Sequence, residues 1–158
     1  MEKITVYCDG GCRGNQRRNN VGGWGYRLEY KGISKEEFGG TRNTTNNKME
    51  IQACIEALNA ITDRTIHTEV VTDSNYLVQG MNKWIKGWKK NGWMTSKGTP
   101  VKNKELWVEL NGISEEFLNI TFTHCYGHAD NEGNIRADFL ANKGMDEQMH
   151  QGQAEGRS

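Results

Sequence analysis

What the chain lacks already excludes several classes of protein. No apolar run in its 158 residues approaches the roughly 20 residues that a helix needs to cross a bilayer. The N-terminal segment is strand-like from its start and lacks the apolar region of a signal peptide. Lys plus Arg and Asp plus Glu both number 20, so the formal net charge is zero. Any attraction for a polyanion must therefore come from local patches.

Cysteine usage and composition indicate one domain in a reducing compartment. The four cysteines form no CxxC pair and show no spacing typical of secreted proteins, so we expect free thiols and a cytoplasmic location. A hydrophobic fraction of 35% with five tryptophans is enough for a packed core. The end of the chain is polar, which predicts a folded domain over residues 1–144 and a flexible tail over 145–158.

Hydrophobic patterning predicts strands first and then an alternation of helices and strands. Strand-like segments are expected at residues 4–8, 24–30, 33–38, 69–72 and 120–125, the first three as an antiparallel meander. Helical spacing is expected at residues 49–61, 74–81, 106–118 and 135–143. This order predicts an α/β (α+β mixed) fold with a five-stranded mixed sheet flanked by helices.

Acidic residues stand where these predicted elements begin or end. Asp9 closes the first strand, Asp73 closes the fourth, and Glu50 lies in the first turn of the helix over 49–61. Asp138 lies within the last helix. If the strands of Asp9 and Asp73 are parallel neighbours, both carboxylates emerge at one sheet edge, where such a cluster repels itself unless it binds a cation such as Mg²⁺.

Each of these residues also has an interpretation without chemistry. Asp73 could cap the helix that follows it, and Glu50, three residues after Asn47, is close to a capping-box pattern. Asp9 could be a turn residue and Asp138 an exposed helix residue. Capping is common enough that no single carboxylate decides between the two readings.

Five sequence blocks together resemble bacterial ribonuclease HI, of the type 1 ribonuclease H family. They are Tyr-Cys-Asp-Gly-Gly-Cys-Arg-Gly-Asn at 7–15, Thr-Thr-Asn-Asn-Lys-Met-Glu at 44–50, Thr-Asp-Ser at 72–74, the Trp-rich stretch at 83–107, and Gly-His at 127–128 with Asn-Ile-Arg-Ala-Asp at 134–138. The resemblance covers about residues 1–144. The second and fourth blocks are the most specific.

The resemblance implies a ribonuclease H-like fold and a metal-dependent endonuclease that cuts the RNA strand of RNA–DNA hybrids. It implies that Asp9, Glu50, Asp73 and Asp138 hold two divalent ions, usually Mg²⁺ with Mn²⁺ possible, and that products carry 5′-phosphate and 3′-hydroxyl ends. In two-metal sites the ions clamp the attacking and leaving oxygens. His128 matches a histidine that assists turnover. A monomer without an obligate protein partner is expected.

Discrimination between RNA and DNA has to use the 2′-hydroxyl group. The resemblance places Asn46 and Asn47 in the minor groove of the hybrid, and Gly11, Cys12 and Asn15 at positions that contact it. Thr45 and Asn15 resemble a pocket for a DNA phosphate. The alternative is that Asn46-Asn47 only starts a helix, with one of the two as its cap.

A basic, tryptophan-rich segment spans residues 83–104, with seven lysines, three tryptophans and no acidic residue. Trp84 and Trp88 are four apart and should share one helix face. This segment resembles the basic handle of some ribonucleases HI, in which Lys86, Lys89 and Lys90 would meet phosphates of the DNA strand. The indoles would pack against sugar or form local core.

Two other functions remain open from the sequence. One is a catalytically weak hybrid-binding module of the same fold, although binding alone does not need an acidic cluster. The other is a different nuclease of the same superfamily, which would share the acidic site but is not expected to carry both the Asn-Asn block and the Trp-Lys handle. Hybrid, duplex DNA and duplex RNA offered side by side would separate them.

Overall fold

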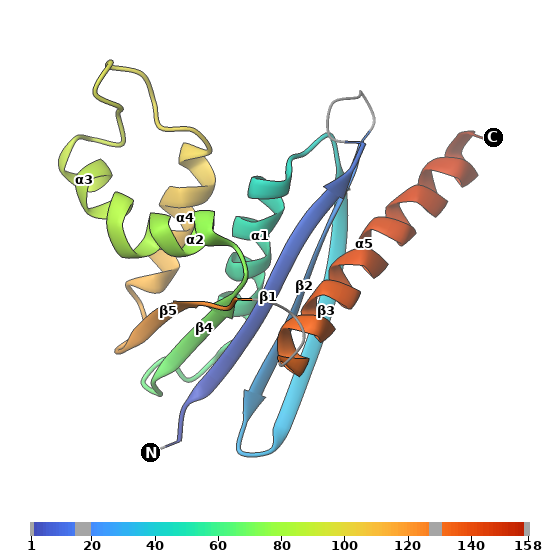
Figure 1. The fold of residues 1–158 in the computed structure, drawn as a ribbon, viewed down its shortest axis with the longest axis horizontal. Helices are drawn as coiled ribbons and strands as arrows, with labels where there is room; N and C mark the ends of the chain where they lie inside the picture. Colours follow the sequence, from blue (N-terminus) through green and yellow to red (C-terminus); the bar gives the residue numbers. More distant parts are fainter. Residues whose placement is uncertain (1, 15–19, 127–130, 157–158) are drawn as a thin grey trace.

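A five-stranded mixed sheet forms the centre of the computed structural model, which describes residues 2–14, 20–126 and 131–156 (Figure 1). The strands are β1 (Ile4–Arg13), β2 (Val21–Tyr30), β3 (Ile33–Arg42), β4 (Thr68–Thr72) and β5 (Ile120–His124). The helices are α1 (Asn46–Asn59), α2 (Asn75–Gln79), the π-helical η1 (Gly80–Trp84), α3 (Ile85–Lys90), α4 (Lys104–Ser114) and α5 (Glu132–Gly156). The predicted fold class is confirmed.

The strand order β3-β2-β1-β4-β5 makes β1 a central strand with two kinds of neighbour. It pairs antiparallel with β2 and parallel with β4, and β4 pairs parallel with β5. The meander predicted for the first three strands is therefore confirmed. Pairing between β1 and β4 ends at Tyr7 and Val71, and from there β1 continues with only β2 beside it.

The main core lies between α1 and one face of the sheet. Alternate residues of β1 (Ile4, Val6, Cys8) are buried against this helix, as the period of two along a strand requires. The helical spacing predicted from Ile51 to Ile61 is confirmed, because all five of its apolar positions are buried. Trp107 of α4 is fully buried and extends the same core.

Helix α5 covers the opposite face of the sheet and lies directly on strand backbone. A Cβ atom at Gly22 would collide with Thr44 and Met49 on the α1 side, whereas one at Gly23 would lie 2.1 Å from the carbonyl oxygen of Ala141. Neighbouring strand residues thus face different helices. The helix and strand can approach this closely only because the strand positions lack side chains.

Helix α5 is longer than the predicted span of 135–143. It continues to Gly156, through most of the segment for which we predicted a flexible tail. Met145 is buried on the sheet, and Arg42 Nη2 donates to the carbonyl oxygen of Gln148 at 2.6 Å. The domain boundary at 144 and the flexibility of 145–158 stay predictions. In the described ranges no helix combines the length and hydropathy that crossing a membrane would take.

The close approach of α5 to β2 leads to a prediction about two glycines. Gly23→Ala should lower the free energy of unfolding by about 2 kcal/mol, because the added methyl group meets helix backbone that cannot move aside. Gly112→Ala is the matched control, since a Cβ atom at Gly112 of α4 meets nothing within 4 Å. That variant should gain about 0.5–1 kcal/mol from helix propensity. Urea denaturation measures both, and an equal response would contradict the packing argument.

Candidate active site

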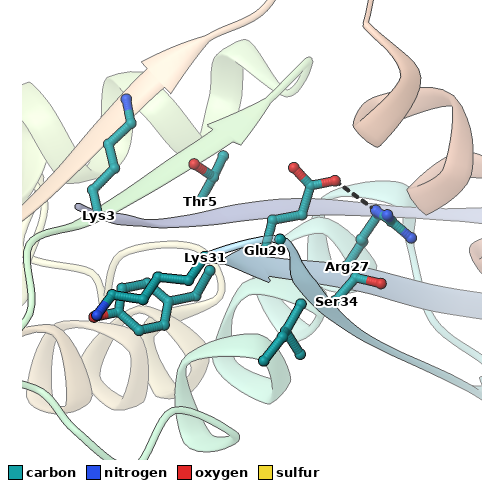
Figure 2. A pocket seen from close by; sticks show the side chains of 9 residues that line it. Lys3, Thr5, Arg27, Glu29, Lys31 and Ser34 are labelled. Carbon is teal, nitrogen blue, oxygen red and sulfur yellow. Dashed lines mark hydrogen bonds and ion pairs between the residues drawn. The ribbon is translucent and has the colours of Figure 1, made fainter.

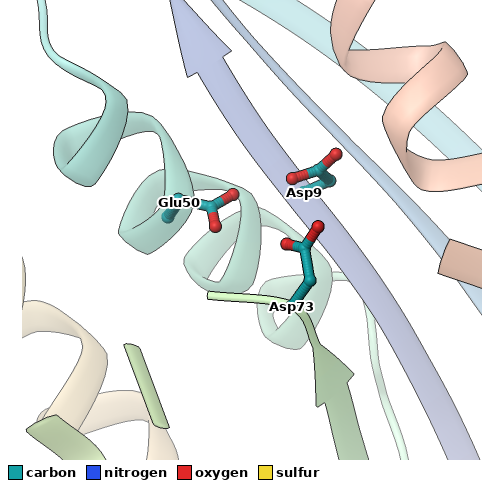
Figure 3. Close-up of side chains that lie close together, drawn as sticks. All are labelled: Asp9, Glu50 and Asp73. Carbon is teal, nitrogen blue, oxygen red and sulfur yellow. The ribbon is translucent and has the colours of Figure 1, made fainter. Parts of the chain in front are cut away.

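Three carboxylates from three separate elements converge at the edge where β4 ends (Figure 3). They are Asp9 on β1, Glu50 on α1 and Asp73 directly after β4, and one oxygen of each lies within 4.8 Å of the others. The sequence predicted that these side chains meet. The structure brings them together.

The parallel pairing of β1 with β4 explains why the two aspartates meet. Each lies two residues beyond the last paired residues, Tyr7 on β1 and Val71 on β4, and parallel strands end at the same sheet edge. Because β4 has already ended there, the N–H of Gly10 is available to side chains. It donates to the carboxylate of Glu50 and, at 2.9 Å, to Asp9 Oδ1.

Gly10 also sets how closely Glu50 can approach the strand. A Cβ atom at this position would lie 2.3 Å from the carbonyl carbon of Met49 and 2.6 Å from the nitrogen of Glu50. Helix α1 therefore contacts β1 backbone to backbone at the residue before Glu50. Any larger residue at position 10 would move Glu50 away from Asp9.

The interpretation of Asp73, Asn46 or Asn47 as a helix cap is not supported by the structure. The N-cap of α1 is Thr45, whose hydroxyl accepts from Lys48 N at 3.1 Å. The N-cap of α2 is Ser74, whose hydroxyl accepts from Leu77 N at 3.1 Å. Neither Asp73 nor Asn46 nor Asn47 therefore caps these helices, and the prediction that one of the two asparagines does so is wrong.

Asp138 approaches the cluster from α5, on the other face of the sheet. Asp138 contributes to the raised pKa of Asp9, as the last of its causes, although it is not part of the group of three whose oxygens lie within 4.8 Å. The structure thus places the fourth predicted carboxylate near Asp9 but outside the group of three. His128 and Asn15, which the sequence also assigned to the site, lie outside the described residues.

Burial and mutual repulsion shift the protonation of this cluster. Burial, and next the charge of Glu50, raise the pKa of Asp9 to about 10. Burial, together with the charge of Asp73, raises the pKa of Glu50 to about 7, against the hydrogen bond that it receives from Gly10 N–H. A cation that neutralises the cluster would displace these protons. Convergent carboxylate oxygens are the donor set that Mg²⁺ and Mn²⁺ prefer, so the residues fit a divalent ion.

The predicted hybrid-contacting residues gather beside this cluster. Cys12 N–H donates to Asn46 Oδ1 at 2.8 Å, which ties the end of β1 to the start of α1. Gly11 lies next to Cys12, and a Cβ atom there would be in ordinary contact with the side chains of Asn46 and Met145, each 3.7 Å away. Thr45 and Asn46 are exposed and Asn47 is half-buried. The hydrogen bond from Cys12 to Asn46 therefore places the end of β1 beside the start of α1, the two segments that carry these residues.

The handle segment, residues 83–104, begins at the end of η1, continues through α3 and is built on an aromatic cluster. The rings of Trp84 and Trp88 lie 5.9 Å apart, and Trp88 lies 5.4 Å from the buried ring of Trp107. Trp84 remains 39% exposed. The indoles were expected either to pack against sugar or to form local core. Trp88 forms local core, because it packs on the buried ring of Trp107.

The three lysines assigned to the handle do not have equal surroundings. Lys86 and Lys90 are exposed. Lys89 forms an ion pair with Glu115, directly beyond α4. The pair neutralises part of the positive charge for which Lys89 was singled out, so Lys86 and Lys90 are the better candidates for a phosphate.

A groove that sequence reasoning missed lies between the starts of α1 and α4. It has a volume of about 550 Å³ and is lined by Lys48, Pro100, Asn103, Lys104, Glu105 and Leu106. Lys48 directly follows Asn47, and Lys104 belongs to the basic segment. Their separation in sequence hid the fact that the two lysines share one groove.

A second hollow, of about 390 Å³, lies at the β2–β3 turn, by the end of β1 away from Asp9 (Figure 2). Two of its three positive charges are paired with carboxylates, and the third, Lys31, lies over the ring of Tyr30. Lys3 pairs with Glu69, and Arg27 pairs with Glu29 and Glu36. These pairings leave the hollow without a clear charge preference, and we assign it no role.

Comparisons with known proteins agree with this geometry. The family model for RNase H matches residues 1–146. The Ribonuclease H of Chromobacterium violaceum is 46% identical over 145 residues, which are 92% of this chain and 96% of that protein. Among solved structures, LC9-RNase H1, described as a type 1 RNase H with the type 2 active-site motif, has a TM-score of 0.83 at 30% identity, over 94% of this chain and 74% of that one. LC11-RNase H1, solved in complex with RNA/DNA hybrid, has a TM-score of 0.68 at 28% identity, over 93% and 99%.

The raised pKa of Asp9 predicts how the stability of the metal-free protein depends on pH. Between its ordinary value of 3.8 and about 10, the folded state holds a proton that the unfolded chain has released, so stability falls as pH rises. Asp9→Asn removes this dependence and should raise the free energy of unfolding by about 1–2 kcal/mol at pH 8 in EDTA.

The control for this measurement is Asp63, a carboxylate whose pKa is lowered by folding rather than raised. The hydroxyl and backbone N–H of Thr65 lower the pKa of Asp63, so Asp63→Asn should lose stability over the same pH range. Denaturation in EDTA from pH 5 to pH 9 separates the two variants. An Asp9→Asn protein no more stable than wild type at pH 8 would contradict the electrostatic description of the site.

Proposed function

The chain belongs to the RNase H family and is an enzyme of the ribonuclease H type, and we propose that it cuts the RNA strand of RNA–DNA hybrids at the Asp9–Glu50–Asp73 cluster with two divalent ions. The products of this reaction would carry 5′-phosphate and 3′-hydroxyl ends. The observation that supports the proposal most strongly is the convergence of three carboxylates within 4.8 Å, in a chain that the RNase H family model matches over residues 1–146.

The metal site of the proposal consists of Asp9, Glu50, Asp73 and Asp138. Two Mg²⁺ ions, or Mn²⁺ in their place, would supply Lewis-acid stabilisation of the attacking and leaving oxygens. Asp9 and Glu50 would give up their protons when the ions bind, because only the ionised forms are ligands. Gly10 N–H holds the carboxylate of Glu50 toward the site. His128, in the proposal, assists turnover by moving a proton or by helping the product to leave.

Recognition of the hybrid would use the surface beside the cluster. We assign Asn46 and Asn47 to the minor groove, where an amide can both donate to and accept from a 2′-hydroxyl. Cys12 and Asn46 are joined by a hydrogen bond, so a nucleic acid strand that contacts one of them would also contact the other. Gly11 would offer backbone contact, and Thr45 with Asn15 would hold a phosphate of the DNA strand.

The DNA strand would continue from this surface toward the handle. The groove with Lys48 and Lys104 lies between the start of α1 and the start of α4, and Lys86 and Lys90 are exposed on α3. Trp84 and Trp88 would support this surface from below, and Lys89 would contribute less because of Glu115. LC11-RNase H1, solved with an RNA/DNA hybrid, supports a hybrid as the ligand of this fold.

The proposal includes a monomer that needs no protein partner and acts in the cytoplasm. The cluster supports a monomer because one chain supplies all three of its carboxylates. The alternative of a catalytically weak hybrid-binding module has no observation in its favour and becomes an outcome of the test below.

The first test of the function is cleavage of a labelled RNA–DNA hybrid by wild type and by Asp73→Asn. Wild type should cut only the RNA strand, only with Mg²⁺ or Mn²⁺, and not in EDTA. Asp73→Asn should lose at least about 100-fold in rate and still bind the hybrid, because the change removes a metal ligand and little else. Duplex DNA and duplex RNA serve as control substrates. Binding without cutting by wild type under every metal would favour the hybrid-binding module.

The handle assignment predicts a salt effect that depends on which lysines are changed. Lys86→Ala combined with Lys90→Ala should weaken hybrid binding at every sequence and reduce the slope of log K against log salt by about 2, close to 0.9 for each lost phosphate contact. Lys89→Ala should have a smaller effect. Binding is measured in the Asp73→Asn background, with Lys31→Ala plus Lys35→Ala at the β2–β3 turn as the matched control. An unchanged slope in the first variant would show that the handle does not contact phosphate.

A further inference from the structure

One exposed aromatic side chain beside the cluster has no role in the function proposed above. Tyr126 follows β5 by two residues and is 90% exposed, the highest value among the large apolar side chains of the described residues. Single exposed aromatic residues occur on any surface. The position of this one, at the sheet edge that carries Asp73, makes it worth testing for contact with the substrate.

Tyr126 is held in place although its ring is exposed. The ring packs edge-to-face on His124, with centroids 4.3 Å apart and an angle of 87° between the planes. His124 Nε2 lies 3.2 Å from the backbone oxygen of Asp73, and a nitrogen that faces a carbonyl oxygen must carry the proton and donate. One imidazole therefore connects the Tyr126 ring to the backbone of a residue in the cluster.

The backbone next to Tyr126 is fixed as well. Cys125 N–H donates to the carbonyl oxygen of Thr72 at 2.8 Å, and Asn131 Nδ2 lies 3.5 Å from Cys125 Sγ. These contacts tie the residue before Tyr126 to the end of β4 and to the start of α5. The tyrosine thus projects from a rigid support, which lowers the entropic cost of a contact with a ligand.

The chemistry of tyrosine suits the backbone of a nucleic acid strand. Its ring can pack against the apolar face of a ribose, and its hydroxyl can donate to a phosphate oxygen without adding charge. The strand nearest to Asp73 is the one whose phosphate enters the cluster, which is the RNA strand if the proposed function holds. We propose that Tyr126 contacts the sugar–phosphate backbone of the RNA strand next to the cleaved phosphate, as a substrate-binding residue.

The test compares Tyr126→Phe and Tyr126→Ala with wild type in steady-state cleavage of the hybrid. Loss of the hydroxyl should raise KM about threefold, and loss of the whole ring about tenfold. The kcat at saturating hybrid should stay within about twofold of wild type, since the contact exists before and during the reaction. Ile33→Ala, at a side chain that is 74% exposed on the β2–β3 turn, is the control and should change neither constant.

A second measurement identifies the strand. In the Asp73→Asn background, a single uncharged methylphosphonate linkage is moved along the RNA strand and then along the DNA strand. One RNA position should weaken binding of the protein with Tyr126 and leave binding of the Tyr126→Phe protein unchanged. The same pattern on the DNA strand would overturn the strand assignment.

The outcomes separate this inference from the function on which it rests. If wild type does not cut the hybrid, the proposed function fails. If wild type cuts but Tyr126→Ala leaves KM within twofold, the inference alone fails. A large fall in melting temperature together with the change in KM would show a structural role and would also overturn the inference, because loss of the ring contact with His124 should lower Tm only slightly.

Discussion

The contact between α1 and β1 at Gly10 is the constraint on which the site depends. Helix and strand meet backbone to backbone there, and the hydrogen bond from Gly10 N–H to Glu50 crosses the same contact. That bond is possible because β4 has ended and no longer competes for the strand's donors. One missing side chain and one shorter neighbouring strand thus bring Glu50 within reach of Asp9.

Packing against the sheet supports this contact from both sides. On the α1 side, buried residues such as Val6, Ile51 and Leu58 hold the helix in register. On the other side, α5 lies on the glycines of β2 and presents Asp138 to Asp9. Apolar packing of the elements that carry them brings the carboxylates together, and the proton held by Asp9 relieves part of their mutual repulsion. The elements that carry the carboxylates are therefore positioned by their own packing on the sheet.

Much of this arrangement could be predicted from the sequence, because periodicity records which face of an element is buried. The spacing from Ile51 to Ile61 identified α1. The prediction that Asp9 closes the first strand is wrong, because β1 runs on beside β2 to Arg13. Asp9 meets Asp73 because the pairing of β1 with β4 ends just before both residues. Features decided by contacts distant in sequence could not be predicted. Thr45 rather than an asparagine caps α1. Helix α5 extends past 143 because Met145 and Gly144 meet glycine-lined strands, which the polar composition of the tail does not reveal. Lys48 and Lys104 share a groove only after folding.

The aromatic cluster of the handle has a consequence for spectroscopy. Of the five tryptophans in the chain, Trp84, Trp88, Trp93 and Trp107 are linked ring to ring with centroid distances between 5.4 and 6.2 Å. Only Trp24 lies apart, stacked on Tyr26 of β2. Four of the five indoles lie in this one region, so most of the tryptophan absorption of the protein arises there. A change in the intrinsic fluorescence of the unlabelled enzyme therefore reports mainly on the handle and its contact with α4, and much less on the rest of the molecule.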